Sequence, residues 1–388
     1  MELFNITLDT TPQNITATEN VFSSFTTAFE NITTSPITKN NVPRTPPRNV
    51  RCGDISSSAT AIRNLSIFIF TVAFIFGAVG NGLVIWITGF RMKKTVNTIW
   101  FLNLAVADFI FTIFLPITIS HTALGNWPFG KFMCKISSFI PMFNMFASVY
   151  FLTIISADRC AFVVFPVWAQ NKRNPKIAVI VATVIWALAL ALSFPYLAFR
   201  DTFFNSKTNL TVCFNNYAFS LDTKNPAIQS LRLMRHKAMI FTRFFGGFLL
   251  PFLIIVVCYG IIIMMLRKNR LVAHSRRPLR LIVAVVVTFF ICWLPYHIFS
   301  LLELSLHGNN CSLKNTVTIG TSLAISLAFI NSCVNPILYV FIGRNAQHRI
   351  RTSILQVIER ALKDEQSQIT RTSKTQSKSM SEATSKFL

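Results

Sequence analysis

Seven long apolar stretches constrain the fold of this chain more than any other feature. A helix that crosses the hydrocarbon core of a bilayer needs about 20 consecutive, mostly apolar residues. Seven stretches meet this requirement, and they span residues 64–90, 98–122, 131–163, 175–198, 237–266, 278–304 and 315–342. The strands of a transmembrane barrel would instead alternate in segments of about ten residues. We therefore predict an all-α membrane protein, a seven-transmembrane helix bundle over residues 61–343.

The composition excludes the main soluble classes. Hydrophobic residues make up 52% of the 388 residues and charged residues only 13%, about half the roughly 25% of an average soluble chain. The formal net charge of +23 would indicate a nucleic-acid partner only if the basic residues formed one face. They lie in short runs between the apolar stretches, so we expect no nucleic-acid partner.

The basic runs set the predicted orientation of the bundle. Lys and Arg are enriched in the cytoplasmic loops of membrane proteins. The runs follow the first, third, fifth and seventh apolar stretches, near residues 91–94, 172–176, 267–277 and 344–351. All of them lie on one side of a seven-helix bundle, which we assign to the cytoplasm. We thus expect a multi-pass plasma-membrane protein whose N-terminus is extracellular.

The terminal regions have compositions unlike the bundle. Residues 1–60 are rich in Thr and Asn, and we expect a disordered extracellular tail. Residues 344–363 repeat apolar side chains at helical spacing, which predicts a short amphipathic helix on the cytoplasmic membrane surface. Residues 364–388 hold many Ser and Thr, and we expect a disordered tail that receptor kinases phosphorylate and arrestin then binds. Sequons on the predicted outer side are candidate glycosylation sites: Asn5, Asn14, Asn31, Asn209 and Asn310.

Cysteines on the predicted outer side are candidates for disulfides, which persist outside the cell. They are Cys52, Cys134, Cys213 and Cys311. Four cysteines allow three pairings. We predict a bridge between Cys134 and Cys213, which leaves Cys52 with Cys311. The second bridge requires the first and last helices to be neighbours, and free thiols are its alternative.

Asp108 is an ionisable residue near the middle of the second apolar stretch. Such residues are costly in a membrane and mark functional sites by default. Its expected inward-facing companions carry neutral oxygens: Ser148, Asn331, Ser332 and Asn335. One carboxylate among neutral oxygens suits a monovalent cation, most simply a sodium ion. A protonated Asp within a cluster of hydrogen-bonded waters is the alternative.

Signatures of enzymes are absent from the sequence. The six His are not at metal-ligand spacing within any span, and neither a phosphate-binding loop, a dinucleotide fingerprint nor a nucleophile elbow occurs. We therefore expect no enzymatic activity, no enzymatic cofactor and no transition-metal site.

Short motifs recur along the stretches in a fixed order. They are Gly80-Asn81, Leu104–Asp108, Asp158-Arg159-Cys160, Trp186, Pro251 with Tyr259, Cys292–Pro295 and Asn335–Tyr339. In this order they resemble the motifs of rhodopsin-like (class A) G-protein-coupled receptors over about residues 60–355. Residues 100–108, 166–171 and 292–297 are most similar to the chemerin and formyl-peptide receptors, a chemoattractant group.

The resemblance implies roles for particular residues. Ligand contacts would be Arg243, Arg200, Glu303, His121, Tyr296 and His297. The activation switch would comprise Asp158, Arg159, Tyr259, Phe289, Trp293, Pro295 and Tyr339. Sodium at Asp108 would stabilise the inactive arrangement, and we expect Asp158 alone to hold Arg159.

These observations predict a receptor for an extracellular, chemerin-like chemoattractant peptide or small protein, coupled to an inhibitory G protein. Arg243 needs an anionic partner, which a peptide C-terminal carboxylate or a lipid acid would supply. An internal pairing with Glu303 or with backbone carbonyls is the alternative. Basic residues between the fourth and fifth stretches also favour an acidic ligand weakly. Two other functions stay open: a decoy receptor that binds ligand without signalling, and a receptor for an acidic lipid such as a prostaglandin.

Overall fold

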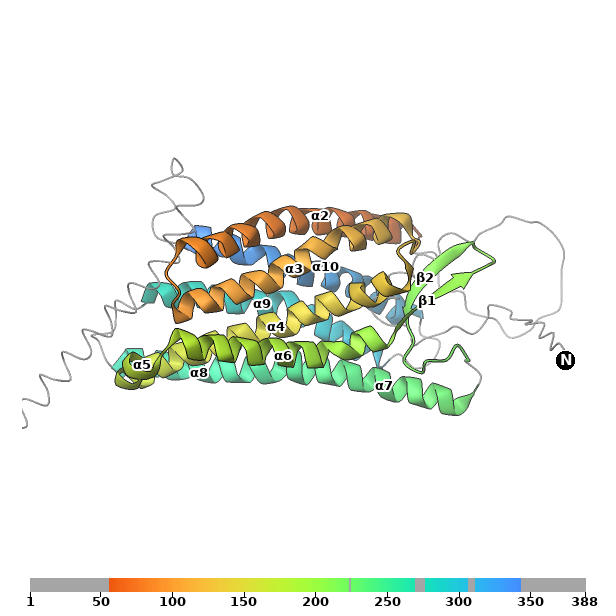
Figure 1. The fold of residues 1–388 in the computed structure, drawn as a ribbon. Coiled ribbons are helices and arrows are strands. Elements are labelled where there is room, and N and C mark those ends of the chain that lie inside the picture. The colour runs from red at the N-terminus through yellow and green to blue at the C-terminus, as the bar shows by residue number, and fades with distance from the viewer. Residues whose placement is uncertain (1–55, 223–224, 269–275, 306–310, 343–388) are drawn as a thin grey trace, which may run out of the picture.

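The protein folds into an elongated helical bundle. The computed structural model describes residues 56–222, 225–268, 276–305 and 311–342. Within them, seven helices are long and apolar enough to cross a membrane, and Figure 1 shows them running along one another. The predicted all-α seven-helix bundle is therefore confirmed.

The helices follow the chain in the expected order. The spanning segments are α2 (Ser56–Trp86) with the π-helix η1 (Ile87–Arg91), α3 (Val96–Leu124), α4 (Gly130–Val164), α6 (Pro175–Ala198), α7 (Pro226–Phe244) with the π-helix η2 (Phe245–Leu249) and α8 (Leu250–Lys268), α9 (Arg276–Glu303) and α10 (Cys311–Ile342). The short helix α5 (Pro166–Lys172) lies at one end of the bundle, and strands β1 (Arg200–Asn205) and β2 (Leu210–Asn215) lie at the other. We call these the α5 end and the hairpin end.

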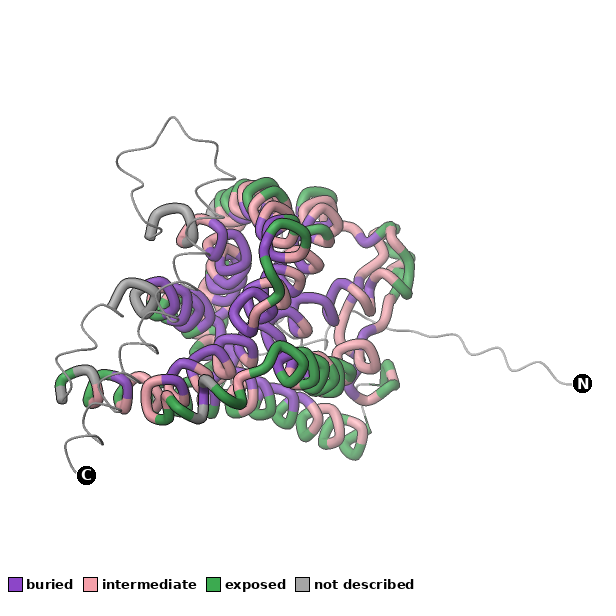
Figure 2. The backbone as a smooth tube through the Cα atoms, turned by 60° about the vertical axis from the view of Figure 1, so that its left-hand side comes forward, coloured by how far each residue is buried: buried purple, intermediate pink, exposed green. Residues whose placement is uncertain are grey.

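Helix α4 forms the centre of the bundle. It is the most buried of the seven spans, and it packs against α3, α6 and α8. Figure 2 shows buried backbone in the interior and exposed backbone around the rim. Helix α10 packs against both α9 and α2, and a Cβ on Gly80 would lie only 2.8 Å from Pro336. The first and last spans are thus neighbours, as a Cys52–Cys311 bridge would require.

Several predicted features fall outside the described residues. They are most of the tail at 1–60, the helix at 344–363, the tail at 364–388, Cys52, the Cys311 side chain and the sequons at Asn5, Asn14, Asn31 and Asn310. The remaining sequon residue, Asn209, is exposed in the turn between β1 and β2 and has a φ of 56°.

The fifth span begins earlier than predicted. Helix α7 starts at Pro226 rather than at residue 237, because Asn225 caps it by accepting a hydrogen bond from the Ala227 amide at 2.9 Å. A proline at the first helical position is already preorganised for a helix. Arg232 and Arg235 therefore lie on a helix and not in a loop.

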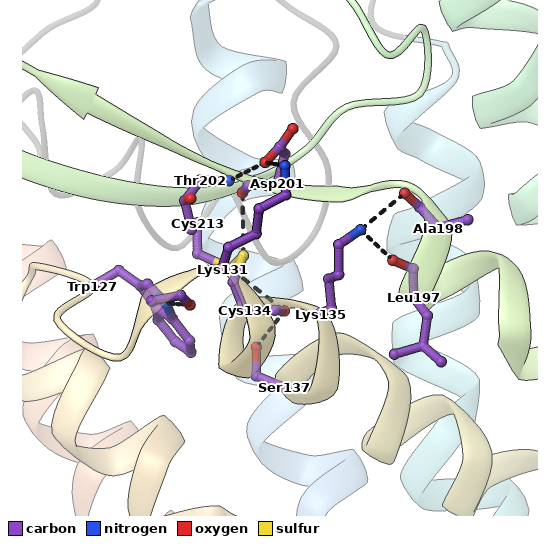
Figure 3. The surroundings of a disulfide bond; sticks show 11 residues. Trp127, Lys131, Cys134, Lys135, Ser137, Leu197, Ala198, Asp201, Thr202 and Cys213 are labelled. Carbon is purple, nitrogen blue, oxygen red and sulfur yellow. Dashed lines mark hydrogen bonds and ion pairs between the residues drawn. A yellow bond between two sulfur atoms is a disulfide. The ribbon is translucent and has the colours of Figure 1, made fainter.

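The β-hairpin is fixed over its end of the bundle, as Figure 3 shows. A disulfide joins Cys134 on α4 to Cys213 on β2, which is the first of the two predicted bridges. Lys131 forms an ion pair with Asp201 at 2.8 Å, and Lys135 donates to the Leu197 carbonyl at 2.8 Å. Burial opposes ionisation of Asp201, but the hydrogen bonds from Lys131, the Thr202 amide and Asn216 together with the Lys131 charge outweigh it, so the pKa of this carboxyl lies below its usual value.

Candidate functional site

A small cavity lies near the hairpin end of the bundle. Its volume is about 30 Å³, which is enough to hold a water molecule. Its walls come from α4, α6, α7, α9, strand β2 and the residues that flank the hairpin: Ser138, Met142, Tyr196, Phe199, Asn215, Tyr217, Met239, Ile240, Arg243 and Tyr296. Arg243 is the only charged residue among them, so a single cation faces aromatic and thioether walls.

Arg243 is buried without a direct ion pair among the described residues. Its Nη2 donates to Ser300 Oγ at 3.0 Å, and its guanidinium lies 4.6 Å from the centre of the Tyr296 ring. Its Nε finds no acceptor in the described part of the chain. A buried charge that is not paired is costly, so this site has unused capacity for an anion.

Glu303 faces His236 and not Arg243. The His236 Nε2 and Glu303 Oε1 atoms lie 3.9 Å apart, which joins α7 to α9 at the hairpin end. The Tyr217 ring stacks on the His236 imidazole with 5.2 Å between ring centres. A direct pair of Arg243 with Glu303, one form of the internal alternative, is therefore wrong, although the Arg243 charge still acts on Glu303.

The predicted ligand contacts separate into two groups. Arg243, Tyr296, His297 and Glu303 lie on α7 and α9, where the His297 ring packs 4.6 Å from the Phe248 ring. Arg200 and His121 form the second group, because the Arg200 charge acts on His121. Burial lowers the pKa of Arg200 to about 10, which leaves the guanidinium charged at neutral pH.

Several residues of this site were not among the predicted contacts: His236, Tyr196, Tyr217 and Ser300. One signal for His236 was present, since it precedes Arg243 by two helical turns and shares its face. It was missed because the fifth span was predicted to begin at residue 237. Tyr217 lies in the loop between β2 and α7. The sequence holds no signal for its position, because the path of a loop leaves no periodic pattern.

The residues around Asp108 come together in the middle of the bundle. Asp108 is completely buried, and Asn335 Nδ2 donates to its Oδ2 at 2.7 Å. With its amide nitrogen toward Asp108, Asn144 donates to Asp108 Oδ1 at 3.2 Å and accepts from Ser332 Oγ at 2.8 Å. Ser148 Oγ lies 3.1 Å from the same amide of Asn144. Asn144 is a member of this cluster that the prediction omitted.

This cluster fits a sodium ion by its chemistry. Sodium is bound by oxygen ligands, as other hard cations are. The side-chain carbonyl oxygens of Asn335, which bonds to Asp108, and of Asn331, one turn earlier on α10, have no hydrogen-bond partner in the part of the chain that the structure describes. The hydroxyl oxygens of Ser148 and Ser332 lie in the same cluster. One carboxylate with neutral oxygens is the donor set that a monovalent cation requires.

A chain of aromatic contacts runs from Arg243 toward the middle of α9. Tyr296, under the guanidinium, contacts Trp293 with 5.7 Å between ring centres. Trp293 in turn lies 6.1 Å from Phe289, whose side chain is fully buried. Pro295 lies inside the same helix, where it removes a backbone hydrogen bond and permits a bend. A series of side-chain contacts thus connects the wall of the cavity to the predicted switch residues on α9.

At the α5 end, Asp158 has a partner that was not predicted. Arg173 donates to both carboxylate oxygens of Asp158 at 2.9 Å and also to the side-chain carbonyl of Asn97. These contacts do not test the expectation that Asp158 alone holds Arg159, which stays a prediction. Arg159 is buried on α4 and Tyr259 is half-buried on α8. The Tyr339 side chain lies outside the described residues.

Comparison with known proteins identifies the family. The model of the 7 transmembrane receptor (rhodopsin family) matches residues 80–339. The chain belongs to this family. It is 44% identical to mouse chemerin-like receptor 2 over 299 residues, which cover 77% of this chain and 81% of that receptor. It is 47% identical to human chemerin-like receptor 1 over 296 residues, 74% of this chain and 77% of that receptor.

The family defines the class of protein. The chain is a class A G-protein-coupled receptor of the chemerin-receptor group, as its motifs predicted. It is a multi-pass plasma-membrane receptor, not an enzyme. Its general partners are an extracellular ligand and a G protein.

Proposed function

We propose that this receptor binds a chemoattractant peptide or small protein of the chemerin type at its hairpin end, which together with the N-terminus faces the outside of the cell. The observation that carries the proposal is Arg243, a buried cation beside a cavity with no ion-pair partner among the described residues. A C-terminal carboxylate would pair with it through charge-assisted hydrogen bonds, which are stronger than hydrogen bonds between neutral groups. The names of the relatives, chemerin-like receptors 1 and 2, support this ligand class.

Ligand binding must favour one arrangement of the bundle over another, or nothing is transmitted. A carboxylate that draws Arg243 from Tyr296 and Ser300 changes the packing above Trp293. Trp293 and Phe289 then repack, and the bend at Pro295 allows the α5 end of α9 to move. This route uses only contacts between neighbouring side chains.

The α5 end would receive the G protein. Arg159, Tyr259 and Tyr339 would line the opened cleft, and the coupling would be to an inhibitory G protein. Phosphorylation of the Ser and Thr in residues 364–388 by receptor kinases would add negative charge to this basic tail. Arrestin would then bind the phosphorylated tail.

Sodium would act as an allosteric ligand of the inactive receptor. Asp108, Ser148, Asn331, Ser332 and Asn335 would hold it, with Asn144 orienting the carboxylate. A bound cation neutralises the buried charge of Asp108, so it stabilises the arrangement in which these oxygens converge.

The test is inhibition of cyclic AMP synthesis in cells that express the chain. The panel holds chemerin, chemerin amidated at its C-terminus, formyl, complement and chemokine peptides, and prostaglandins. We expect a response to chemerin that amidation or Arg243→Gln weakens at least tenfold and that Arg159→Ala abolishes. Lys237→Gln, an exposed basic residue on the same helix, is the matched control and keeps the response.

The alternatives give different results in the same assay. Binding or uptake of chemerin without any change in cyclic AMP would favour a decoy receptor. A response to prostaglandins alone would favour an acidic-lipid receptor. An unchanged response of Arg243→Gln to chemerin would overturn the assignment of Arg243 as the anion contact.

A further inference from the structure

Three buried ionisable side chains lie together between α7 and α9 at the hairpin end. They are Arg243, Glu303 and His236, and all are buried. The Arg243 charge acts on both Glu303 and His236. Without a ligand, the cation of Arg243 and an ionised Glu303 carboxylate are not in direct contact but balance in net charge, so the cluster is neutral when His236 is neutral. A ligand carboxylate brings a second negative charge into this closed space.

A buried cluster with an uncompensated charge is costly, and ionisable groups restore neutrality by changing protonation state. We infer that binding of a ligand carboxylate at Arg243 is coupled to the uptake of one proton by the His236–Glu303 pair. The inference rests on the proposed function, because it assumes that the ligand is an anion. The site it assigns is a proton-binding site between two helices.

The geometry of the pair suits a shared proton. The 3.9 Å between His236 Nε2 and Glu303 Oε1 is too long for a hydrogen bond and short enough to close by side-chain rotation. The other polar atoms of the pair, His236 Nδ1 and Glu303 Oε2, have no hydrogen-bond partner among the described residues. An added proton strengthens the bridge whether it forms an imidazolium or a carboxylic acid, so the two groups titrate as one unit.

The other polar groups around the pair do not take this role. Tyr217 stacks on His236, and Tyr196 and Tyr296 border Arg243. Phenols are neutral near pH 7 because their ordinary pKa is about 10, and burial raises the pKa of Tyr217 well above that value. His297, on the same helix as Glu303, packs against Phe244 and Phe248. Ser300 does not titrate, and Arg200, whose charge acts on Tyr217, stays cationic at neutral pH because its pKa lies at about 10.

Proton uptake makes ligand affinity depend on pH. When binding takes up one proton, affinity rises by up to about tenfold for each unit by which pH falls, until the pair is already protonated without ligand. The expected result is therefore a tighter complex at mildly acidic pH. The dependence is steepest where the free receptor holds no proton on the pair and the complex holds one.

The experiment measures binding of two synthetic peptides with the C-terminal sequence of chemerin, one with a free carboxylate and one amidated. For the purified receptor, we expect the affinity of the free-acid peptide to rise severalfold over one unit of falling pH around neutrality. The amidated peptide shows no such rise. Glu303→Gln keeps the shape of the side chain without its charge, so it binds the free acid with high affinity at every pH.

The experiment has a matched control and distinguishes failure of the proton coupling from failure of the proposed function. Asp222→Asn removes an exposed carboxylate near the same end and keeps the pH dependence of the unmodified receptor. If amidation and Arg243→Gln have no effect on binding, the proposed function fails. If both weaken binding but affinity does not change with pH, or Glu303→Gln keeps the slope, the proton coupling is wrong and the proposed function stands.

A measurement without ligand decides the matter if neither peptide binds. Arg243→Gln leaves the buried Glu303 carboxylate uncompensated, as a bound anion would. Because the folded protein then binds the proton more tightly than the unfolded chain, the melting temperature of this variant should fall as pH rises. The double variant Arg243→Gln/Glu303→Gln should lose that dependence. Equal pH profiles of the two variants would overturn the inference.

Discussion

Arg173 holds together three parts of the chain at the α5 end. It follows α5, pairs with Asp158 on α4 and donates to Asn97 on α3. The side chains of Arg173 and Asp158 are only 17% and 14% exposed, so solvent screens the pair less than a surface ion pair. Removing one partner of such a pair leaves a charge poorly compensated.

We expect Asp158→Asn to lower the free energy of unfolding by about 1–3 kcal/mol, between the values for exposed and fully buried ion pairs. Thermal unfolding of the purified receptor measures this loss. Lys172→Gln removes a neighbouring exposed charge and should leave the melting temperature unchanged. Equal melting temperatures of Asp158→Asn and the unmodified receptor would show that the pair does not contribute to stability.

Asp108 gives a second prediction at the scale of single residues. If its cluster binds sodium, replacing potassium chloride by sodium chloride at constant ionic strength should raise the melting temperature of the unliganded receptor. Asp108→Asn should abolish this difference, because the amide cannot neutralise the cation, and Ser148→Ala should reduce it. Identical melting curves of the unmodified receptor in the two salts would favour the protonated-Asp alternative.

The π-helix η2 is an element whose geometry depends on a neighbour. A π-turn leaves a backbone carbonyl without its usual helical partner, and here Tyr150 on α4 donates to the Gly246 carbonyl at 3.1 Å. A Cβ at Gly247 would lie 3.0 Å from the Phe146 ring, so a glycine is required for α4 and η2 to approach. This contact fixes the register of α7 and α8 against the centre of the bundle.

Tyr150→Phe should therefore destabilise the receptor by about 1 kcal/mol, the net contribution of one hydrogen bond. Chemical denaturation of the purified receptor measures the change. Thr183→Val is the matched control, because the Thr183 hydroxyl bonds only to its own helix, at Val179, on an exposed face. If both variants lose the same stability, the bond between α4 and η2 has no special role.

The elements also show what the sequence could and could not predict. The seven spans were predictable because each contains a continuous apolar stretch long enough to cross a bilayer. The first turns of α7 were not, since Arg232, Arg235 and Lys237 interrupt that signal, although the Asn225-Pro226 start was a capping pattern. The β-hairpin was missed because Arg200–Asn205 and Leu210–Asn215 lack a strict alternation of apolar and polar residues.

The sequence indicated which residues belong to the candidate site, but not which side chains they contact. Arg243 and Asp108 stood out because a charge inside a membrane span is costly. Their neighbours depend on how distant helices pack, so the sequence did not indicate that Glu303 faces His236 or that Asp158 pairs with Arg173. Motif resemblance named the switch residues on α9, and packing alone brings Tyr296 from that helix to Arg243.

At the scale of the whole molecule, the two ends of the bundle have different chemistry. The hairpin end holds the Cys134–Cys213 disulfide and the exposed sequon residue Asn209, and disulfides and N-linked glycans are typical of extracellular surfaces. The α5 end exposes Arg91, Lys93, Lys94, Lys172 and Lys176, as cytoplasmic loops do. We therefore expect opposite accessibility of the two ends in intact cells.

Single cysteines introduced at exposed positions test this orientation. Ser206→Cys lies in the hairpin turn and Lys172→Cys at the end of α5. A charged maleimide cannot cross a membrane, so it should label Ser206→Cys on intact cells and Lys172→Cys only after permeabilisation. Glycosidase treatment should lower the apparent mass of the receptor on a gel, and Asn209→Gln should make this decrease smaller. Labelling of Lys172→Cys on intact cells would reverse the orientation and move the ligand site to the cytoplasmic side, which would contradict the proposed function as a whole.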